Sequence, residues 1–343
     1  MRIIAGKYKG RRLLDFKGND IRPTTDRIKE TIFNIIQFKI PGSVVIDLFA
    51  GTGALGIESI SRGAQEVDLI DNSANSIEII KNNLNKIEGN IKLHKNDAIS
   101  FLNRRSEKAD VFFVDPPYKS ELGIEAVKYI CKKDLLNYGG VIVHEHSTDV
   151  DYAFLNKGYK IDKRQMGAVK VDFIYKRDIV MFAGSFDPVT VGHVAIVEKA
   201  LEKYNEVLVA MLINIDKKYT FNKYIRLDML KHTFKDYKRV EVIFSEQYAY
   251  EVAQEYGITR FIRGIRNDGD FEYEEKISAF NAQYGIVTEY IQLDKYQDVS
   301  STSVKNEIEQ GLFTNLPINA KLTLLKDSYG DSNGNIWSID WRA

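Results

Sequence analysis

Short runs of apolar residues, many of them β-branched, recur along the chain and are separated by segments in which apolar residues return every three or four positions. The short runs are typical of buried strands, and the longer spacing is typical of amphipathic helices. Strands that alternate with helices indicate an α/β fold with mostly parallel sheets. In the first half of the chain the predicted strands are residues 44–46, 66–70, 90–94, 111–114, 141–144 and the closing strand 169–175. In the second half they are residues 179–182, 206–212, 239–244, 260–262 and 287–292.

The two series of strands begin in the same way, with an apolar run, a glycine-containing turn and a helix pattern. A chain of 343 residues also exceeds the usual size of one domain, roughly 100 to 200 residues. We therefore predict two consecutive doubly wound Rossmann-like domains, residues 1–177 and 178–327. The linker between them is Lys176-Arg177-Asp178. Residues 328–343 are rich in Ser, Asp, Gly and Asn and are expected to form a loosely ordered tail.

The composition is that of an ordinary soluble globular protein, with 44% hydrophobic and 28% charged residues. The single cysteine, Cys131, cannot form a disulfide within the chain, which favours a reducing compartment. Basic residues interrupt the N-terminus before an apolar core of signal-peptide length develops, and no apolar run approaches the length that spans a bilayer. The sequence therefore predicts a cytoplasmic protein without a membrane partner.

The first glycine turn carries candidate residues for binding an adenosyl group. Asp47 ends a strand and is followed by Gly51-Thr52-Gly53, where glycines allow a tight turn and a close approach of a ligand to the backbone. This loop alone is weak evidence, because many nucleotide-binding proteins have one. Asp71 ends the next strand, where its carboxylate can accept both ribose hydroxyls. Asp97 follows the third strand and can accept a hydrogen bond from an adenine amine.

The segment Asp115-Pro116-Pro117-Tyr118 follows the fourth strand and suits methyl transfer to the exocyclic amine of a base. Such an amine is a poor nucleophile because its lone pair is delocalised, so a methylase must accept hydrogen bonds from its N–H groups. The Asp115 carboxylate and the Pro116 carbonyl can be these acceptors, and Tyr118 can stack on the unstacked base. A sulfonium methyl is already activated, so we expect no metal here. The alternatives are a mere strand-terminating turn and a dehydrogenase, but hydride transfer does not require this motif.

The formal net charge is zero, yet basic residues gather near the N-terminus. A basic segment is often only a solvated face. Ahead of a methyltransferase domain, however, we interpret it as an arm that contacts nucleic acid. The basic residues of this arm are Arg2, Lys7, Lys9, Arg11, Arg12, Lys17, Arg22, Arg27 and Lys29. The candidate RNA contacts among them are Arg11, Arg12, Arg22 and Arg27.

Four segments of the first half together resemble the bacterial 16S ribosomal RNA guanine-N2 methyltransferase family. They are residues 1–6 (MRIIAG), 21–27 (IRPTTDR), 47–58 (DLFAGTGALGIE) and 115–118 (DPPY). The resemblance covers residues 1–177. It implies a class I methyltransferase sheet with an antiparallel closing strand, S-adenosylmethionine as the methyl donor, and a guanine amine of the small ribosomal subunit as the acceptor. Asp71 stands where the family is expected to have the longer Glu, which would alter the ribose contact slightly.

In the second half, His193 stands where a helix predicted at residues 194–204 begins. A helix N-terminus presents free N–H groups and the positive end of the helix dipole, so phosphate is favoured there. His193 can donate to an α-phosphate whose charge grows in the transition state. Lys217, Arg263 and Arg266 follow successive strands and are expected on the same rim, although each can also be a solvated surface residue.

Hydroxyl side chains precede a second predicted helix, residues 304–310. Ser300, Ser301 and Thr302 can clamp the β- and γ-phosphates of a nucleotide, and they can serve as an ordinary N-cap at the same time. No protein nucleophile is needed for this reaction, because an acceptor phosphate attacks directly and pyrophosphate leaves. Catalysis then consists of positioning and charge stabilisation, with Mg²⁺ on the triphosphate.

Three segments of the second half resemble bacterial phosphopantetheine adenylyltransferases. They are residues 190–193 (TVGH), 263–274 (RGIRNDGDFEYE) and 299–302 (VSST). The resemblance spans residues 178–327 and implies a nucleotidyltransferase-type parallel sheet, a homo-oligomer, and transfer of an adenylyl group from ATP to 4′-phosphopantetheine. It implies that Ser185, Lys217 and Arg263 bind the acceptor. It implies that ATP is bound by Phe186, His193, Gly264, Ile265, Arg266, Glu274, Tyr296, Ser300, Ser301 and Thr302.

We therefore favour a bifunctional enzyme whose halves catalyse unrelated reactions. Residues 214–216 depart from the loop expected before Lys217, so the conformation of that loop is not predicted. One alternative for the second half is a nicotinamide or nicotinate mononucleotide adenylyltransferase or a cytidylyltransferase, and residues 270–274 speak against it. Another alternative is a ribosome-binding or assembly protein in which one half is a retired catalyst. The intact motifs speak against retirement.

Overall fold

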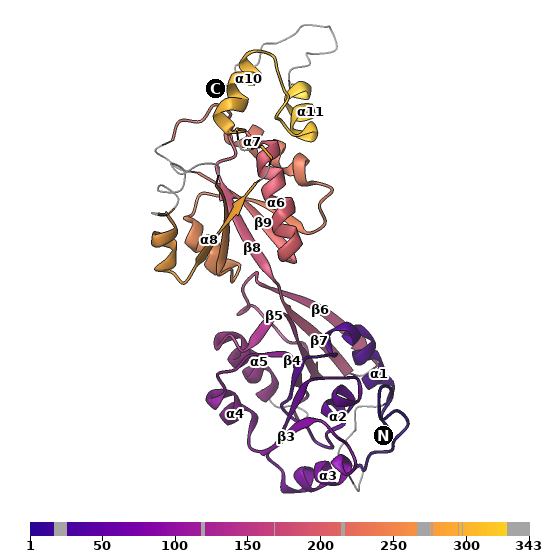
Figure 1. Ribbon diagram of the computed structural model, residues 1–343. Coiled ribbons are helices and arrows are strands. Elements are labelled where there is room, and N and C mark those ends of the chain that lie inside the picture. Colours follow the sequence, from indigo (N-terminus) through magenta and orange to yellow (C-terminus); the bar gives the residue numbers. More distant parts are fainter. Residues whose placement is uncertain are drawn as a thin grey trace. The chain divides into compact units, whose positions relative to one another are not determined.

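The computed structural model describes residues 1–16, 26–117, 121–167, 169–213, 217–265, 275, 277–293, 295–296 and 298–327. The chain divides into two compact units (Figure 1). The first comprises Met1–Leu155 and Tyr159–Arg177, and the second comprises Asn156–Gly158 and the chain from Asp178 onward. The predicted tail, residues 328–343, lies outside the described residues.

The first unit is built on a seven-stranded sheet with the strand order β3-β2-β1-β4-β5-β7-β6. The strands are β1 (Val44–Asp47), β2 (Glu66–Asp71), β3 (Asn90–Lys95), β4 (Ala109–Val114), β5 (Leu136–His146), β6 (Tyr159–Met166) and β7 (Val169–Lys176). The first five are parallel, whereas β7 pairs antiparallel with both β5 and β6. The predicted antiparallel closing strand is thereby confirmed.

The sequence pattern missed β6. Its residues Lys160, Asp162, Lys163 and Arg164 give it a polar sequence, and several of its positions are exposed. Such polarity is typical of an edge strand, which needs charge to discourage pairing with other chains. The strand is recognisable only once β7 offers it a partner, because pairing with a neighbour rather than burial holds it in place.

Helices cover both faces of the first sheet. They are α1 (Asp26–Ile35), α2 (Ala54–Ser61), α3 (Ala74–Leu84), α4 (Ala98–Arg104) and α5 (Leu122–Lys132), with a short 3₁₀ helix at Gln37–Lys39. The parallel strands alternate their side chains between the two faces. Side chains of α1, α2 and α3 pack on one face, around Val45, Phe113 and Val143. Side chains of α4 and α5 pack on the other, around Ile46 and Phe112.

The second unit has a five-stranded sheet with the order β10-β9-β8-β11-β12, and all its paired strands are parallel. The strands are β8 (Ile179–Gly184), β9 (Glu206–Leu212), β10 (Val240–Ser245), β11 (Arg260–Ile265) and β12 (Val287–Gln292). The described helices are α6 (Val191–Lys203), α7 (Lys223–Phe234), α8 (Ala249–Glu255), α10 (Ser301–Glu309) and α11 (Ile318–Asp327). Strand order departs from chain order at β8 and β11, and ligands of such sheets bind beyond the carboxyl ends of the strands at this point.

Two predicted helices of this unit begin three residues earlier than expected. The first starts at Val191 rather than at residue 194, because Thr190 accepts a hydrogen bond from the His193 N–H and caps it. The second starts at Ser301 rather than at residue 304, because Ser300 caps it in the same way through Ser303. Capping hydroxyls therefore set both boundaries, and they place His193 within the first turn of α6.

Candidate active sites

The glycine turn after β1 holds the candidate adenosyl-binding residues together. Gly51 and Gly53 both have positive φ angles, 55° and 78°, which glycine adopts without strain. The main-chain N–H of Gly51 donates to Oδ2 of Asp71 at 2.8 Å, and the N–H of Ser73 donates to Oδ1 of Asp71 at 2.8 Å. Each carboxylate oxygen has a second lone pair, so Asp71 can fix the turn and still accept from a ribose.

Asp47 lies beneath this turn with a 1% exposed side chain, and its Oδ2 accepts the N–H of Gly56 at 3.1 Å. Burial, together with the nearby carboxylates Asp115 and Asp71, raises the pKa of Asp47 to about 7. Gly56 permits this packing, because a Cβ there would lie 2.2 Å from Leu69. Thr52 is buried and its carbonyl accepts from the Asn83 amide at 2.9 Å.

Asp97 serves as the N-cap of α4, where its Oδ1 accepts the N–H of Ser100 at 2.8 Å. The hydrogen bonds from Ser100 hold the pKa of Asp97 below its usual value. Asp97 is exposed, so its second oxygen can still meet an adenine amine. The cap is thus a structural role that accompanies the predicted one.

Asp115, Pro116 and Pro117 leave β4 at its carboxyl end and line a cavity of about 360 Å³. Tyr118, the last residue of the predicted motif, lies outside the described residues. The opposite wall comes from the end of β5 and the loop after it, including His144, Glu145 and His146.

The sequence pattern gave no role to these β5 residues. His144 and His146 are spaced by two along the strand, which puts both on one face, and their rings lie 5.0 Å apart. Nε2 of His146 bonds to Asp172 at 2.9 Å, and Nδ1 of His144 bonds to the Tyr152 hydroxyl at 2.8 Å. The only signal for them was polarity at the end of an otherwise apolar strand.

The basic arm is only partly available for RNA. The Arg11 guanidinium donates to the carbonyls of Lys86 and Asn85, beyond the end of α3. Lys29, one of the basic residues of the arm, is completely buried and paired with Glu58 at 3.2 Å. Glu58 is a buried residue of α2, and its carboxylate needs a counter-charge. Arg12 and Arg27 are exposed, and Arg22 lies outside the described residues.

In the second unit, His193 is held by the cap of its own helix. The main-chain N–H of Thr190 donates to Nδ1 of His193 at 2.9 Å. Nδ1 must therefore be unprotonated in the neutral ring, and the ring proton sits on Nε2. His193 lines a small pocket with Gly264, Ile265 and Tyr296. Four residues predicted to bind ATP thus share one pocket.

Two of the predicted acceptor-binding residues are in direct contact, because the Lys217 ammonium donates to the Ser185 hydroxyl at 3.2 Å. The third, Arg263, projects from β11 and donates to the Ala183 carbonyl at 3.1 Å. The guanidinium of Arg226, which sequence reasoning missed, is buried and donates to the Ser185 carbonyl at 2.7 Å. Arg266 and Glu274 lie outside the described residues.

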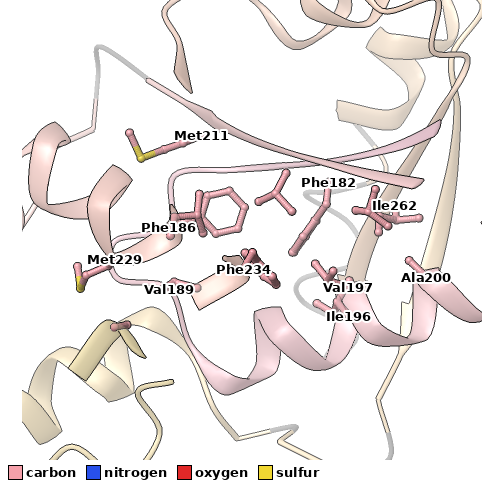
Figure 2. Close-up of a cluster of buried hydrophobic side chains, with 14 of the residues drawn as sticks. Phe182, Phe186, Val189, Ile196, Val197, Ala200, Met211, Met229, Phe234 and Ile262 are labelled. Carbon is pink, nitrogen blue, oxygen red and sulfur yellow. The ribbon is translucent and has the colours of Figure 1, made fainter. Parts of the chain in front are cut away.

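The Phe186 side chain does not line the candidate nucleotide pocket. It is 2% exposed and packs in the core between Phe182 and α7 (Figure 2). A phenyl ring gains most from such burial, so any contact of Phe186 with ATP must come from its main chain. The ring packs 5.1 Å from the His193 imidazole, so Phe186 supports the histidine instead.

The hydroxyl residues at the start of α10 meet the loop after β8. The Ser301 hydroxyl donates to the Pro188 carbonyl at 3.0 Å, whereas Ser300 caps the helix and Thr302 is exposed. Lys305 of the same helix pairs with the buried carboxylate of Asp187 at 2.7 Å. Asp187 also accepts the N–H groups of Thr220 and Phe221, so it links the loop after β8 to the segment that follows Lys217.

Two features are absent from the described residues. No helix in the described ranges combines the length and apolarity required to cross a membrane. The same ranges contain no group of three or more His, Cys, Asp or Glu side chains arranged to hold a metal ion.

Comparison with known proteins divides the chain in the same two parts. Residues 1–175 match the family model described as conserved hypothetical protein 95, and residues 181–307 match the cytidylyltransferase-like model. The Bacillus subtilis (strain 168) protein named "Putative rRNA methyltransferase YlbH" is 38% identical over 156 residues, covering 44% of this chain and 85% of that protein. The phosphopantetheine adenylyltransferase of Streptococcus pyogenes serotype M1 is 40% identical over 134 residues, covering 38% of this chain and 82% of that protein.

Among solved structures, the Escherichia coli protein named "Putative methyltransferase yhhF" is 29% identical, with a TM-score of 0.47, and covers 52% of this chain and 98% of that one. The family matches and the two curated relatives together identify the parts of this chain. The chain is a fusion whose first half belongs to the conserved hypothetical protein 95 family, with rRNA methyltransferase-like relatives, and whose second half belongs to the cytidylyltransferase-like family, with phosphopantetheine adenylyltransferases as relatives.

Proposed function

We propose that the first unit transfers a methyl group from S-adenosylmethionine to the exocyclic N2 amine of a guanine in small-subunit rRNA. The relative named as an rRNA methyltransferase supports RNA as the substrate. The glycine turn tied to Asp71 and the buried Asp47 support an adenosyl site at the ends of β1 and β2. S-adenosylmethionine supplies the methyl group already activated as a sulfonium.

The residues after β4 bind and orient the amine. The Asp115 carboxylate and the Pro116 carbonyl accept hydrogen bonds from the two N–H groups of the amine and aim its nitrogen lone pair at the methyl group. The observation that carries this proposal is the cavity beside Asp115–Pro117, which opens at the carboxyl edge of the sheet that also holds Asp47 and Asp71.

The test is transfer of labelled methyl from S-adenosylmethionine to small ribosomal subunits that lack the modification, followed by nuclease digestion and identification of the nucleoside. Labelled N2-methylguanosine is the expected product. Labelled N6-methyladenosine, or no label in RNA, would refute the proposed acceptor. Mapping the labelled position by mass spectrometry identifies the guanine.

We propose that the second unit adenylylates 4′-phosphopantetheine with ATP and releases pyrophosphate. The curated relatives named phosphopantetheine adenylyltransferase support this choice. Lys217 and Ser185 lie in contact and would hold the acceptor phosphate, assisted by Arg263. The acceptor phosphate attacks the α-phosphate in line and pyrophosphate leaves, so the protein supplies position and charge, and Mg²⁺ on the triphosphate would neutralise further negative charge.

The observation that carries this second proposal is the tautomer of His193. Because Nδ1 accepts the Thr190 N–H, the ring proton of His193 is on Nε2, and the ring lines the pocket that contains Gly264 and Tyr296. A donor fixed in this way can bind the α-phosphate as its charge grows. The test is pyrophosphate release with 4′-phosphopantetheine and ATP. Faster release with nicotinamide mononucleotide, or with CTP in place of ATP, would contradict the proposal.

A further inference from the structure

The cavity beside Asp115–Pro117 has a second wall whose chemistry is not explained by the motif alone. This wall consists of the last residues of β5 and the loop that follows, and it contains His144 and Glu145. Both side chains are nearly buried, with exposed fractions of 2% and 9%. Buried polar side chains that line a cavity are candidates for recognising a ligand specifically, because hydrogen bonds are stronger where water is excluded.

The His144 ring is held in this wall by a hydrogen bond between its Nδ1 and the Tyr152 hydroxyl, at 2.8 Å. Either group can be the donor in this bond, so the bond fixes the orientation of the ring and not its tautomer.

The His144 ring and the proline of the motif both line the cavity. A Cβ built on Gly123 would lie 2.4 Å from Nε2 of His144 and 2.8 Å from Cγ of Pro116, so Nε2 and the proline border the same small space. Burial lowers the pKa of His144 to about 4, so the ring is neutral near pH 7.

Glu145 stands next to the motif carboxylate. Val114 of β4 pairs with His144 of β5, and the same parallel register continued by one residue sets Asp115 beside Glu145 on one face. The alternation of side chains puts His144 on the other face. The cavity therefore brings together the carboxylates of Asp115 and Glu145.

This set of acceptors matches a base edge rich in donors. Guanine presents the N1–H next to the two N–H groups of its N2 amine. Adenine has an unprotonated N1 beside its amine, and a carboxylate opposite that lone pair is repelled. A site that is built to accept a hydrogen bond from the base strongly disfavours a base without that donor. The buried acceptor is then left without a hydrogen-bond partner.

We propose that Glu145 selects guanine by accepting the N1–H of the target base while Asp115 holds the N2 amine. This inference rests on the proposed methyl transfer to guanine, and it assigns the choice of base to a residue outside the Asp-Pro-Pro-Tyr motif. Asp115 and Pro116 alone accept from any exocyclic amine and do not distinguish N2 of guanine from N6 of adenine.

The test uses the full chain and small-subunit RNA that carries either guanine or 2-aminopurine at the mapped position. 2-Aminopurine keeps the N2 amine but has a lone pair at N1. Wild-type protein should methylate guanine in preference to 2-aminopurine by about 10³-fold or more in kcat/KM. In Glu145→Gln the amide NH₂ can donate to N1 of 2-aminopurine while its oxygen still accepts from guanine. The preference should therefore fall at least about tenfold.

Glu125→Gln is the matched control, because Glu125 is an exposed carboxylate of α5 that does not line the cavity. It should keep the wild-type preference. Equal losses on both bases in Glu145→Gln would overturn the proposal. Binding of S-adenosylmethionine shows whether Glu145→Gln is folded. If it is not, the wild-type measurement still tests the proposal, because a wild-type ratio of kcat/KM between the two bases close to one would overturn it. Failure of wild-type protein to methylate guanine RNA at all would instead refute the proposed function.

Discussion

The main-chain N–H of Thr190 donates to Nδ1 of His193 at 2.9 Å, so the cap of α6 also sets the tautomer of the candidate catalytic histidine. The same contact orients the ring against Phe186. One residue pair thus forms the helix cap and, in the proposed function, also orients the donor to the α-phosphate. Mutation of the histidine therefore needs a control for helix stability.

His193→Ala should lower pyrophosphate release by roughly 10²- to 10³-fold, the usual effect of removing one donor to a developing oxyanion. Methyl transfer by the same preparation should be unchanged, because the residue lies in the other compact unit. Both activities are measured on one sample. Glu202→Ala, an exposed change on the same helix, is the control and should leave both intact. Loss of methyl transfer in His193→Ala would refute independent sites.

Lys217→Ala should raise the KM for 4′-phosphopantetheine by about tenfold or more, since a charge-assisted contact to phosphate contributes roughly 1.5 to 3 kcal/mol. The KM for ATP should change little. The reason is the contact of the Lys217 ammonium with Ser185, which marks the acceptor side of the site. Initial rates at varied concentrations of each substrate measure both constants.

Lys218→Ala is the control for that measurement, because Lys218 is an exposed lysine one position along the same loop. It removes the same charge from the same region of the surface. If the two variants raise the acceptor KM equally, the effect is general electrostatics and Lys217 has no specific contact with the phosphate.

The arrangement of strands and the order of the motifs could be predicted from the sequence because both depend on local patterns. Apolar runs located β1 and β9, and the glycine turn located the carboxyl edge of the first sheet. The polar edge strand β6 was missed because its sequence lacks the apolar run of a buried strand, and antiparallel pairing with the adjacent β7 holds it.

The candidate sites were predictable only where a motif carries its own chemistry. Asp71 and His193 belong to such motifs, whereas Arg226 and His144 look like ordinary helix and strand residues until their neighbours are known. Phe186 shows that a motif does not set the direction of a side chain, since its ring lies in the core, and its contact with ATP stays a prediction. The local sequence shows which groups are neighbours along the chain. It does not show where a side chain points, because that direction depends on packing in the fold.

The stability of the first unit should depend on pH through Asp47. Burial raises its pKa to about 7 in the folded protein, above the value of an unfolded aspartate, near 3.8. A raised pKa of an acid means that the stability it contributes is fully present below pH 4 and is lost as the pH rises through 7. The loss approaches about 1.4 kcal/mol per pH unit within this window.

Asp47→Asn cannot ionise and should lack this loss. Hydrogen exchange of peptides that cover β1, corrected for intrinsic exchange rates, gives the free energy of opening for both proteins between pH 5 and 8. The free energy of opening of the variant, relative to that of the wild type, should increase as the pH rises to 7. Above pH 7 this difference should stay constant. Parallel pH profiles of the two proteins would contradict the raised pKa.

The N-terminal arm should be anchored by the buried carboxylate of Glu58. Its two oxygens accept the N–H groups of Ile4 and Ala5 at 2.8 and 3.0 Å, and it pairs with Lys29 and Arg62. Glu58→Gln leaves a buried lysine without its counter-charge, and breaking a buried pair in this way costs about 3 to 5 kcal/mol.

The loss should appear as faster hydrogen exchange in peptides that cover residues 1–15 and α2, with β9 in the other unit unchanged. Glu88→Gln is the matched control, because Glu88 pairs with Lys7 of the same arm on the exposed surface. Solvent screens that pair, so its removal should leave exchange of the arm close to wild type. Equal acceleration in both variants would mean that the arm is held by general attraction between charges and that the buried position of Glu58 contributes nothing special.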